Sequence, residues 1–432
     1  MSVRGLTARS TAASSGLRVG LFGLLGVGNI GNDASLESML TYLRTVHSGA
    51  RIDALCAGPR VVADRYGIPA APLYWYYERN QETPRVIAAI LKVLGRVIDL
   101  IRTLWWVRRH DVVIVPGMGI LEASLPLRPW QTPYALFLVC VSARLFGTKV
   151  ALVSVGAGRI NQRLTRWLFN SAARLAFYRS YRDEGAREAM RQRGLDTTAD
   201  HVYPDLAFAI PSEPYEIGDP ETVVVGVMAH YGNNDDRKHA DEIHTTYVAK
   251  MKAFVGWLVD HGRKVRLTIG DTNGSDVVVA QEIVADIRAS RPGLDSSRVV
   301  AEPMATFADV SRTIQSASSV VAIRYHNVLC ALKLAKPTIA IGYSPKHEAL
   351  MTGMGLRDFY EPVGSLDVDG LIGRFTELER RSAELRQTLT ERNSVNVQLL
   401  DDQFAELSAV LFGLRQPAPS ATPEWPAVEG AA

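Results

Sequence analysis

Short apolar runs alternate with helical patterns along almost the whole chain. In the first half, apolar runs bounded by polar and glycine residues predict strands at residues 17–25, 51–57, 112–115, 150–155, 176–181 and 201–203. Between them, apolar residues at helical spacing predict helices at residues 33–46, 85–109, 132–146, 162–175 and 184–193. Strands and helices in this alternation are typical of a parallel sheet with helices on its faces.

The alternation is interrupted once and then resumes. Residues 211–221 are rich in proline and acidic side chains and lack apolar periodicity, which is typical of a linker. Beyond them, strands are predicted at residues 222–228, 264–269, 299–301, 319–324 and 338–343, and helices at residues 245–260, 277–290, 305–315 and 327–334. The pattern therefore predicts an N-terminal α/β domain at residues 17–210, a C-terminal α/β domain at residues 222–365 and polar helices at residues 366–413. Residues 1–16 and 414–432 have the composition of disordered tails.

Composition narrows the class of protein. The chain has 432 residues, of which 47% are hydrophobic and 22% charged, as expected for a globular protein of two or three domains. A net charge of +3 is too small to indicate a nucleic-acid partner. The cysteines, Cys56, Cys140 and Cys330, are far apart and form no metal-binding or disulfide pattern, so we expect them to be reduced in the cytoplasm. We expect no secretory signal and no spanning helix, because no apolar run reaches about 20 residues without a charge.

The first candidate site follows the first predicted strand. Ligands of open parallel sheets bind at the carboxyl ends of the strands, so these junctions are where chemistry is expected. The run from Gly26 to Gly31 matches the dinucleotide pattern G-x-G-x-x-G, and Asp53 lies 22 positions beyond it, near the place of a ribose-binding acid. However, Asp53 lies inside a predicted strand, and Asp33 would repel a pyrophosphate. Asp33 suits either of two roles, the cap of the helix or a partner for a sugar hydroxyl.

Three further junctions carry glycine or a cation. Gly119 ends the turn that begins at Pro116, and its small size lets backbone N–H groups face a ligand. Arg159 follows a second glycine-containing turn. Arg182 lies just before Asp183, the predicted cap of the next helix, and can either face a ligand or form an ion pair within its domain.

Two adjacent junctions in the second half carry the densest set of candidate residues. Arg324 and His326 follow the strand predicted at residues 319–324 and open a helix. Lys346 opens the next predicted helix, after the strand at residues 338–343. A helix N-terminus favours anions, a guanidinium adds phosphate or carboxylate recognition, and an imidazole can transfer a proton near neutral pH. These junctions therefore predict an anion site with an acid–base group.

At these residues the chain resembles the polysaccharide pyruvyl transferase family. The family's motifs are G-N-x-G-D-[DE] after a strand, a glycine-rich turn, an R-D pair, R-x-H before a helix, and a G-x-P-x-I-x-I-x-Y strand followed by lysine. They correspond in order to Gly28–Asp33, Pro116–Gly119, Arg182–Asp183, Arg324–His326, and Ala335–Tyr343 with Lys346. Asn32 replaces the first acid of the opening motif, and Pro116 and Met118 interrupt the glycine run.

The resemblance implies a fold and a reaction. The fold is α/β, with two facing Rossmann-like domains and a central cleft, similar to the GT-B glycosyltransferases. The reaction moves pyruvate from phosphoenolpyruvate to a sugar of a polysaccharide or glycolipid as a ketal, with no cofactor and no metal. We expect Arg324, Arg182 and Lys346 to bind the anionic donor and His326 to be the acid. Asp33 and Asn29 would bind the acceptor. Further substrate contacts are assigned to Gly31, Gly119 and Arg159.

Three other functions stay open. A nucleotide-sugar glycosyltransferase would use the same basic helix starts for a diphosphate. An NAD(P)-dependent oxidoreductase would use the G-x-G-x-x-G run, and a non-catalytic binding subunit would have lost activity through the change at Asn32.

The predicted helix at residues 85–109 has a separate interpretation. Lys92, Arg96, Asp99 and Thr103 recur at helical spacing and form a narrow polar stripe on a mostly apolar helix. In one interpretation the apolar side is buried against the sheet and the stripe faces water. In the other, the helix contacts anionic lipid at the cytoplasmic face of a membrane, where a lipid-linked acceptor would lie.

Overall fold

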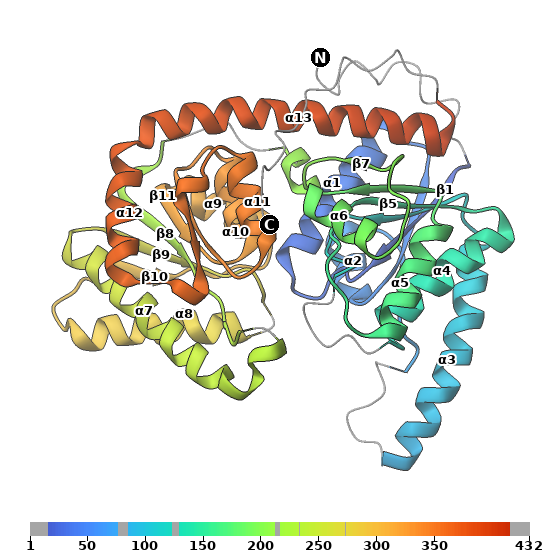
Figure 1. Ribbon diagram of the computed structural model, residues 1–432, viewed down its shortest axis with the longest axis horizontal. Helices are drawn as coiled ribbons and strands as arrows, with labels where there is room; N and C mark the ends of the chain where they lie inside the picture. The colour runs from blue at the N-terminus through green and yellow to red at the C-terminus, as the bar shows by residue number, and fades with distance from the viewer. Residues whose placement is uncertain are drawn as a thin grey trace. The chain divides into compact units, whose positions relative to one another are not determined.

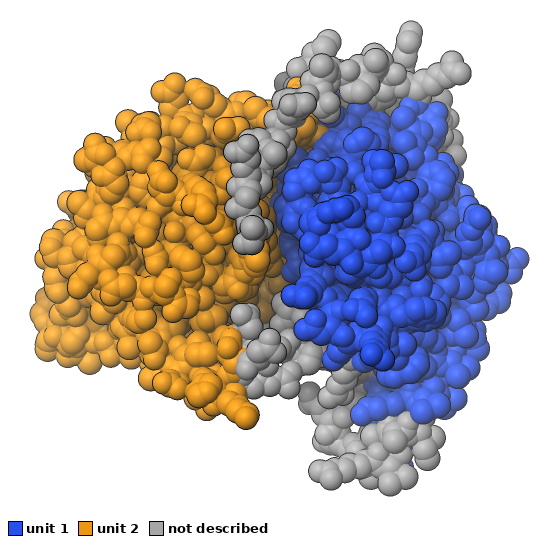
Figure 2. Space-filling model, viewed as in Figure 1, with its two compact units in different colours: residues 1–27, 35–206, 401–419 blue, residues 28–34, 207–400, 420–432 orange. Residues whose placement is uncertain are grey.

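The computed structural model describes residues 16–76, 85–122, 129–211, 217–232, 234–272 and 274–414. These residues form two compact units, shown in different colours in Figure 2. Unit 1 contains the residues up to Val27, Ser35–Leu206 and the residues from Asp401 onward; unit 2 contains Gly28–Ala34 and Ala207–Leu400. The tails expected at residues 1–16 and 414–432 lie outside the described residues, except for Gly16 and Leu414.

Unit 1 is built on a parallel sheet of seven strands, in the order β3-β2-β1-β4-β5-β6-β7 (Figure 1). The central strands are almost fully buried because they read as continuous apolar runs, which is expected when helices cover both faces of a sheet. The strands are β1 (Arg18–Gly23), β2 (Arg51–Cys56), β3 (Ala70–Pro72), β4 (Val112–Pro116), β5 (Lys149–Val155), β6 (Tyr178–Tyr181) and β7 (His201–Val202).

The helices of unit 1 lie between these strands in the sequence. They are α1 (Ile30–Val46), α2 (Pro59–Tyr66), α3 (Arg85–Val107), α4 (Thr132–Phe146), α5 (Arg163–Leu175) and α6 (Glu184–Gln192). All but α2 were predicted from apolar periodicity, with ends that differ by a few residues. The first five residues of α1 group with unit 2 and the rest with unit 1.

Unit 2 contains a second parallel sheet, in the order β10-β9-β8-β11-β12-β13. Its strands are β8 (Asp219–Gly226), β9 (Lys264–Thr268), β10 (Val299–Ala301), β11 (Ala317–Ala322), β12 (Thr338–Gly342) and β13 (Tyr360–Pro362). Its helices are α7 (Ala240–Asp260), α8 (Ser275–Ser290), α9 (Phe307–Gln315), α10 (Tyr325–Lys333), α11 (Pro345–Gly353) and α12 (Val368–Arg380).

Both sheets share one topology. Each starts in the middle, builds outward over three strands and then returns to continue on the other side, as in the doubly wound Rossmann fold. The order reverses between β1 and β4 in unit 1 and between β8 and β11 in unit 2. The prediction of an α/β fold with two Rossmann-like sheets is confirmed. Among the described helices, none is long and apolar enough to cross a membrane.

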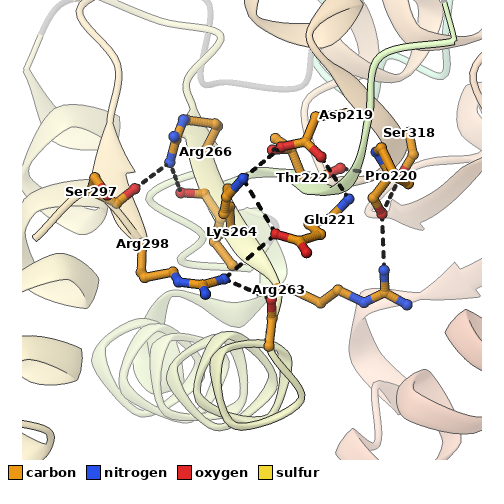
Figure 3. A network of polar contacts seen from close by, with 12 residues as sticks. Asp219, Pro220, Glu221, Thr222, Arg263, Lys264, Arg266, Ser297, Arg298 and Ser318 are labelled. Carbon is orange, nitrogen blue, oxygen red and sulfur yellow. Dashed lines mark hydrogen bonds and ion pairs between the residues drawn. The ribbon is translucent and has the colours of Figure 1, made fainter. Parts of the chain in front are cut away.

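The segment predicted to be a linker is partly a strand. Residues 212–216 lie outside the described residues, but Asp219 and Glu221 belong to β8. Asp219 accepts hydrogen bonds from Lys264 (3.0 Å) and Thr222 (2.9 Å), and Lys264 also pairs with Glu221 at 3.3 Å (Figure 3). A backbone hydrogen bond from Glu221 and the Lys264 side chain lower the pKa of Asp219 to about 2. Asp219 and Glu221, whose acidic side chains were interpreted as part of a linker, instead connect the start of β8 to β9 through Lys264.

The last helix, α13 (Ser382–Phe412), contributes residues to both units. In unit 2, the Asn393 amide donates to the carbonyls of Leu332 and Lys333, both at 2.9 Å. In unit 1, Gln403 forms hydrogen bonds with Ser154 of β5 and Ser180 of β6.

The structure differs from the interpretation in which the polar stripe of α3 faces water. Asp99 and Thr103 are buried, with 4% and 5% of their surface exposed. By contrast, Val93 and Trp105 are exposed by 72% and 57%. Asp99 turns inward because it accepts a hydrogen bond from the Trp75 backbone N–H (2.8 Å) and pairs with arginines on either side of it. Asp99 and Thr103 of the stripe therefore face the protein, whereas Lys92 is exposed together with the apolar side chains that face outward.

Candidate functional site

The order reversal in unit 2 places Arg324 where a ligand of this fold is expected. Arg324 lies just after β11 and is the N-cap residue of α10. Its Nε and Nη2 each donate to a different carboxylate oxygen of Asp276, both at 2.7 Å. Nη1 forms no hydrogen bond with another residue that the structure describes. The two hydrogen bonds to Asp276 therefore fix the guanidinium of Arg324, and its Nη1 can donate to a further acceptor.

Asp276 holds this junction together. It lies in the first turn of α8 and is completely buried. It also accepts hydrogen bonds from the backbone N–H groups of Ala229 (3.0 Å), after β8, and Gly270 (3.5 Å), after β9. Burial alone would lower the pKa of Arg324, but the hydrogen bonds and charge of Asp276 outweigh burial and raise it. Sequence reasoning missed Asp276, although the polar run at residues 270–276 directly follows a predicted strand.

His326 lies in the first turn of α10 and is close to the opening motif of the chain. Its ring stands edge-on to Tyr325, with ring centres 5.1 Å apart. A Cβ atom at Gly31 would overlap the His326 imidazole, so a larger residue there would have to displace the ring. The glycine of the opening motif and the histidine of the R-x-H motif, almost 300 residues apart, are therefore neighbours within unit 2.

Backbone hydrogen bonds fix the opening motif in this position. The Ile30 N–H donates to Gly270 O (3.3 Å), and the Thr272 N–H donates to Gly28 O (3.0 Å). Oδ1 of Asn29 accepts from the backbone N–H groups of Gly31 and Asn32, at 3.1 and 3.2 Å, and thereby caps α1. The role of helix cap, which was one of the two considered for Asp33, is thus filled by Asn29. Asp33 follows in the first turn of α1, with only 4% of its surface exposed.

Lys346 and His347 lie at the next junction, after β12. The Lys346 ammonium lies over the rings of Tyr325 and Tyr343, 5.5 and 5.9 Å from their centres. His347 is completely buried; its Nε2 lies 3.0 Å from Ile323 O and its Nδ1 lies 3.3 Å from the Ser344 hydroxyl. Through Tyr325, the junction after β12 contacts the one after β11, as the sequence predicts for adjacent strands.

A cavity of about 690 Å³ opens beside this junction within unit 2. Its wall includes His230, Tyr247, Tyr343 and Glu348. Burial lowers the pKa of His230, which favours the neutral imidazole. Sequence reasoning did not single out His230, although it follows the strand predicted at residues 222–228.

Three of the predicted residues belong to unit 1, after β4, β5 and β6. Gly119 closes a turn in which Met118 adopts a left-handed backbone (φ 48°), at the position where the family's glycine run is interrupted. Arg159 is exposed. Arg182 is buried and forms an ion pair with Glu122, and its guanidinium lies 3.7 Å from Asp183 and 3.9 Å from Asp205. This is the intradomain pairing that we considered as its second interpretation. Its assignment to donor binding stays a prediction.

Asp53 has partners that do not suit a ribose-binding acid. Its Oδ1 accepts from the Trp106 indole (2.7 Å), and its Oδ2 lies 3.0 Å from Nε2 of His110. Both partners lie at or just beyond the end of α3. These contacts weigh against the dinucleotide interpretation of the opening glycines.

Comparison with known proteins identifies one family and one fold. The family model described as polysaccharide pyruvyl transferase matches residues 29–345. Among curated proteins, none matches the chain. A solved structure of a putative UDP-N-acetylglucosamine 2-epimerase from Listeria monocytogenes is similar, with a TM-score of 0.59, 11% identity, and coverage of 93% of this chain and 98% of that one.

Two further structures are similar in the same way. The UDP-GlcNAc 2-epimerase from Neisseria meningitidis bound to UDP-GlcNAc gives a TM-score of 0.55 at 11% identity, covering 89% of this chain and 99% of that one. A lipopolysaccharide outer core galactosyltransferase gives 0.50 at 11% identity, covering 92% and 99%. At these identities the likeness concerns the fold, that of GT-B glycosyltransferases and related epimerases.

Proposed function

Because the chain belongs to the polysaccharide pyruvyl transferase family, we propose that it transfers pyruvate from phosphoenolpyruvate to two hydroxyls of a sugar, forming a ketal and releasing phosphate. The observation that carries this proposal is the cluster of Arg324, His326 and Lys346 at two neighbouring helix starts in unit 2. Arg324 and His326 follow β11, where the sheet of unit 2 reverses its strand order, and Lys346 follows the neighbouring strand β12.

The donor is a small dianion or trianion, and the cluster suits it. Arg324 is held by Asp276 through Nε and Nη2, so its Nη1 edge presents a hydrogen-bond donor in a fixed direction. The N-terminus of α10 adds backbone N–H groups and a partial positive charge. Lys346 adds a second cation at the next helix start. Arg182 is proposed as a further contact, which requires a rearrangement of its carboxylate partners.

His326 is proposed as the acid. A proton delivered to the methylene carbon of phosphoenolpyruvate makes the methyl group and leaves positive charge at the adjacent carbon. One sugar hydroxyl attacks that carbon, phosphate leaves with its bridging oxygen, and the second hydroxyl closes the ketal. The two hydroxyl protons balance the proton consumed and the proton carried by phosphate. The imidazole is positioned by Gly31 and Tyr325, which restrict its ring.

The acceptor is proposed to be a glycan or lipid-linked sugar, handled in the cytoplasm or at the inner face of the membrane. Asp33 and Asn29 lie beside Gly31 in the same segment, so a hydroxyl bound there would be near His326. Asn29 would contribute its amide group, because its Oδ1 caps α1. Gly119 and Arg159 are proposed as further substrate contacts. No metal or cofactor takes part in the proposed reaction.

A nucleotide-sugar glycosyltransferase is the second candidate. The similar structures include one bound to UDP-GlcNAc, and the cavity of about 690 Å³ beside Lys346 is large enough for part of such a ligand. Titration of the full chain with phosphoenolpyruvate and with UDP-sugars by calorimetry separates the two candidates, because each predicts binding of only one donor.

The decisive experiment combines binding and turnover in His326→Ala. With phosphoenolpyruvate and a sugar bearing neighbouring hydroxyls, we expect phosphate release and a product whose mass includes the added pyruvate. His326→Ala should lower kcat by roughly 10²- to 10⁴-fold while donor binding stays nearly intact. His239→Ala is the matched control, because its side chain is 70% exposed at the start of α7. Full turnover in His326→Ala would refute the acid assignment.

A further inference from the structure

Helix α3 presents a row of apolar side chains away from the rest of unit 1. Val93, Val97, Ile101 and Trp105 repeat every four residues and are exposed by 72%, 52%, 51% and 57%. We call these four residues the outer row. At a rise of 1.5 Å per residue, the row extends over about 18 Å. Scattered exposed apolar residues are normal on a protein surface, but a continuous row of this length is not.

The opposite side of α3 explains why this row cannot turn inward. Gly95, Asp99, Thr103 and Val107 also repeat every four residues, offset by two from the outer row, and all are buried. A Cβ at Gly95 would lie 3.2 Å from Tyr76, so the chain approaches closely there. Arg102 fixes the same side by donating to Pro72 O at 2.9 Å. The orientation of α3 is therefore set by polar contacts, and the apolar row is left outside.

The surroundings of the outer row are basic. Lys92, Arg108 and Arg109 are exposed in or directly after α3. The only acid within α3 is Asp99, which is buried. Helix α4, which packs against α3, contains Arg144 and no acidic residue. Arg108 and Arg109 lie 6.0 and 5.8 Å from the Trp105 ring, so cations flank the end of the apolar row.

We propose that the outer row of α3 docks on a membrane surface that contains anionic lipid. Apolar side chains that enter the headgroup region, an indole at the level of the interface and flanking arginines are what an interfacial helix uses. Figure 1 shows α3 at the edge of unit 1, beside α4. This binding does not depend on the reaction proposed above.

A second copy of the chain fits this face less well than a bilayer does. A stable protein interface buries about 800 Å² on each partner and involves about 20 residues or more. A row of four side chains on one helix falls well short of that. A two-fold contact through α3 would also bring Lys92, Arg108 and Arg109 of two copies together, and like charges repel.

Vesicle co-sedimentation of the full chain tests the proposal. We expect the wild-type protein to bind phosphatidylcholine vesicles that contain phosphatidylglycerol, to bind pure phosphatidylcholine weakly, and to dissociate as salt is added. Arg108→Gln with Arg109→Gln should weaken binding by roughly fivefold for each arginine. Val97→Glu with Ile101→Glu should weaken it by more than about tenfold, because two charges would enter the apolar layer.

Matched variants make the test specific. Val278 on α8 is 61% exposed, so Val278→Glu adds a charge at an equally open apolar site in unit 2. Arg187→Gln with Arg191→Gln removes the same charge from α6. Both controls should bind vesicles like the wild type, and circular dichroism should show that all variants are folded.

Three outcomes would overturn the proposal. The first is that the wild-type protein stays in the supernatant at low salt. The second is that the controls lose binding as strongly as the α3 variants. The third is that sedimentation velocity shows self-association abolished by Ile101→Glu, without vesicle binding. Failure of pyruvyl transfer would leave this test unaffected, since no substrate is added.

Discussion

Replacing Arg324 by glutamine should separate its structural role from its role in donor binding. The guanidinium forms a two-bond fork with Asp276, whose carboxylate is completely buried. Removing one partner of a buried ion pair costs about 3–5 kcal/mol, chiefly because the other charge remains in a poorly solvated place. The Arg324 side chain is 23% exposed, so water can partly compensate and the lower end is expected. We therefore expect Arg324→Gln to lose about 3 kcal/mol of unfolding free energy.

A second variant and a control test whether this loss of unfolding free energy comes from the unpaired buried charge of Asp276. Arg324→Gln with Asp276→Asn removes the buried charge while Asn can still accept from Ala229, so stability should return to within about 1 kcal/mol of the wild type. Arg291 forms the same kind of fork with Asp260 at 2.8 and 2.7 Å, but Asp260 is 55% exposed. Arg291→Gln should cost less than about 1 kcal/mol, because exposed ion pairs contribute little.

Urea unfolding followed by circular dichroism, and calorimetry with phosphoenolpyruvate, measure the two roles. Donor binding should weaken by about 2–3 kcal/mol in both the single and the double variant, since both lack the guanidinium. The argument fails if Arg324→Gln is no less stable than Arg291→Gln, or if the double variant is as unstable as the single one. Donor affinity restored together with stability would remove Arg324 from the donor site.

Two other predictions concern acid stability and the position of the imidazole. Burial lowers the pKa of His47 to about 4. The folded state therefore keeps its full stability above the ordinary histidine pKa of about 6.5 and loses up to about 3 kcal/mol as pH falls from there to about 4. His47→Gln should flatten the fall in unfolding free energy over that range, and parallel pH profiles for variant and wild type would contradict this. Gly31→Ala should displace the His326 ring and lower kcat at least about tenfold with donor affinity almost unchanged, whereas unchanged kcat would show that the ring has room to move.

The sequence predicted most of the strands and helices because their apolar residues repeat locally. Two short strands, β3 and β13, were missed. Each has only three residues, and each includes a proline, so no alternation can be read from it. Helix α2 was missed for a similar reason, since only Val62 of its eight residues is buried. Local patterns fail where an element is too short to show one.

Long-range pairing accounts for the other differences. Nothing in the local sequence joins Arg324 to Asp276, 48 positions earlier, or Gly31 to His326. The sequence pattern also could not predict which side of α3 faces inward, because a polar stripe on a helix is normally solvated. Here Asp99 finds a backbone N–H and two arginines inside the fold. Lys336 is a similar case, since it is completely buried and donates to three backbone carbonyls.

The contribution of α13 to both units has a consequence for how the chain folds as it is made. Unit 1 includes residues from Asp401 onward, and these close buried contacts with its N-terminal part. Gln403 reaches Ser154 and Ser180, and Ser408 lies 2.7 Å from the Tyr42 hydroxyl. During synthesis from the N-terminus, the sheet of unit 1 is complete long before these residues leave the ribosome. The buried polar contacts of unit 1 with α13 therefore stay incomplete while Ala207–Leu400 of unit 2 are translated, and holdase chaperones would act on the nascent chain during this interval.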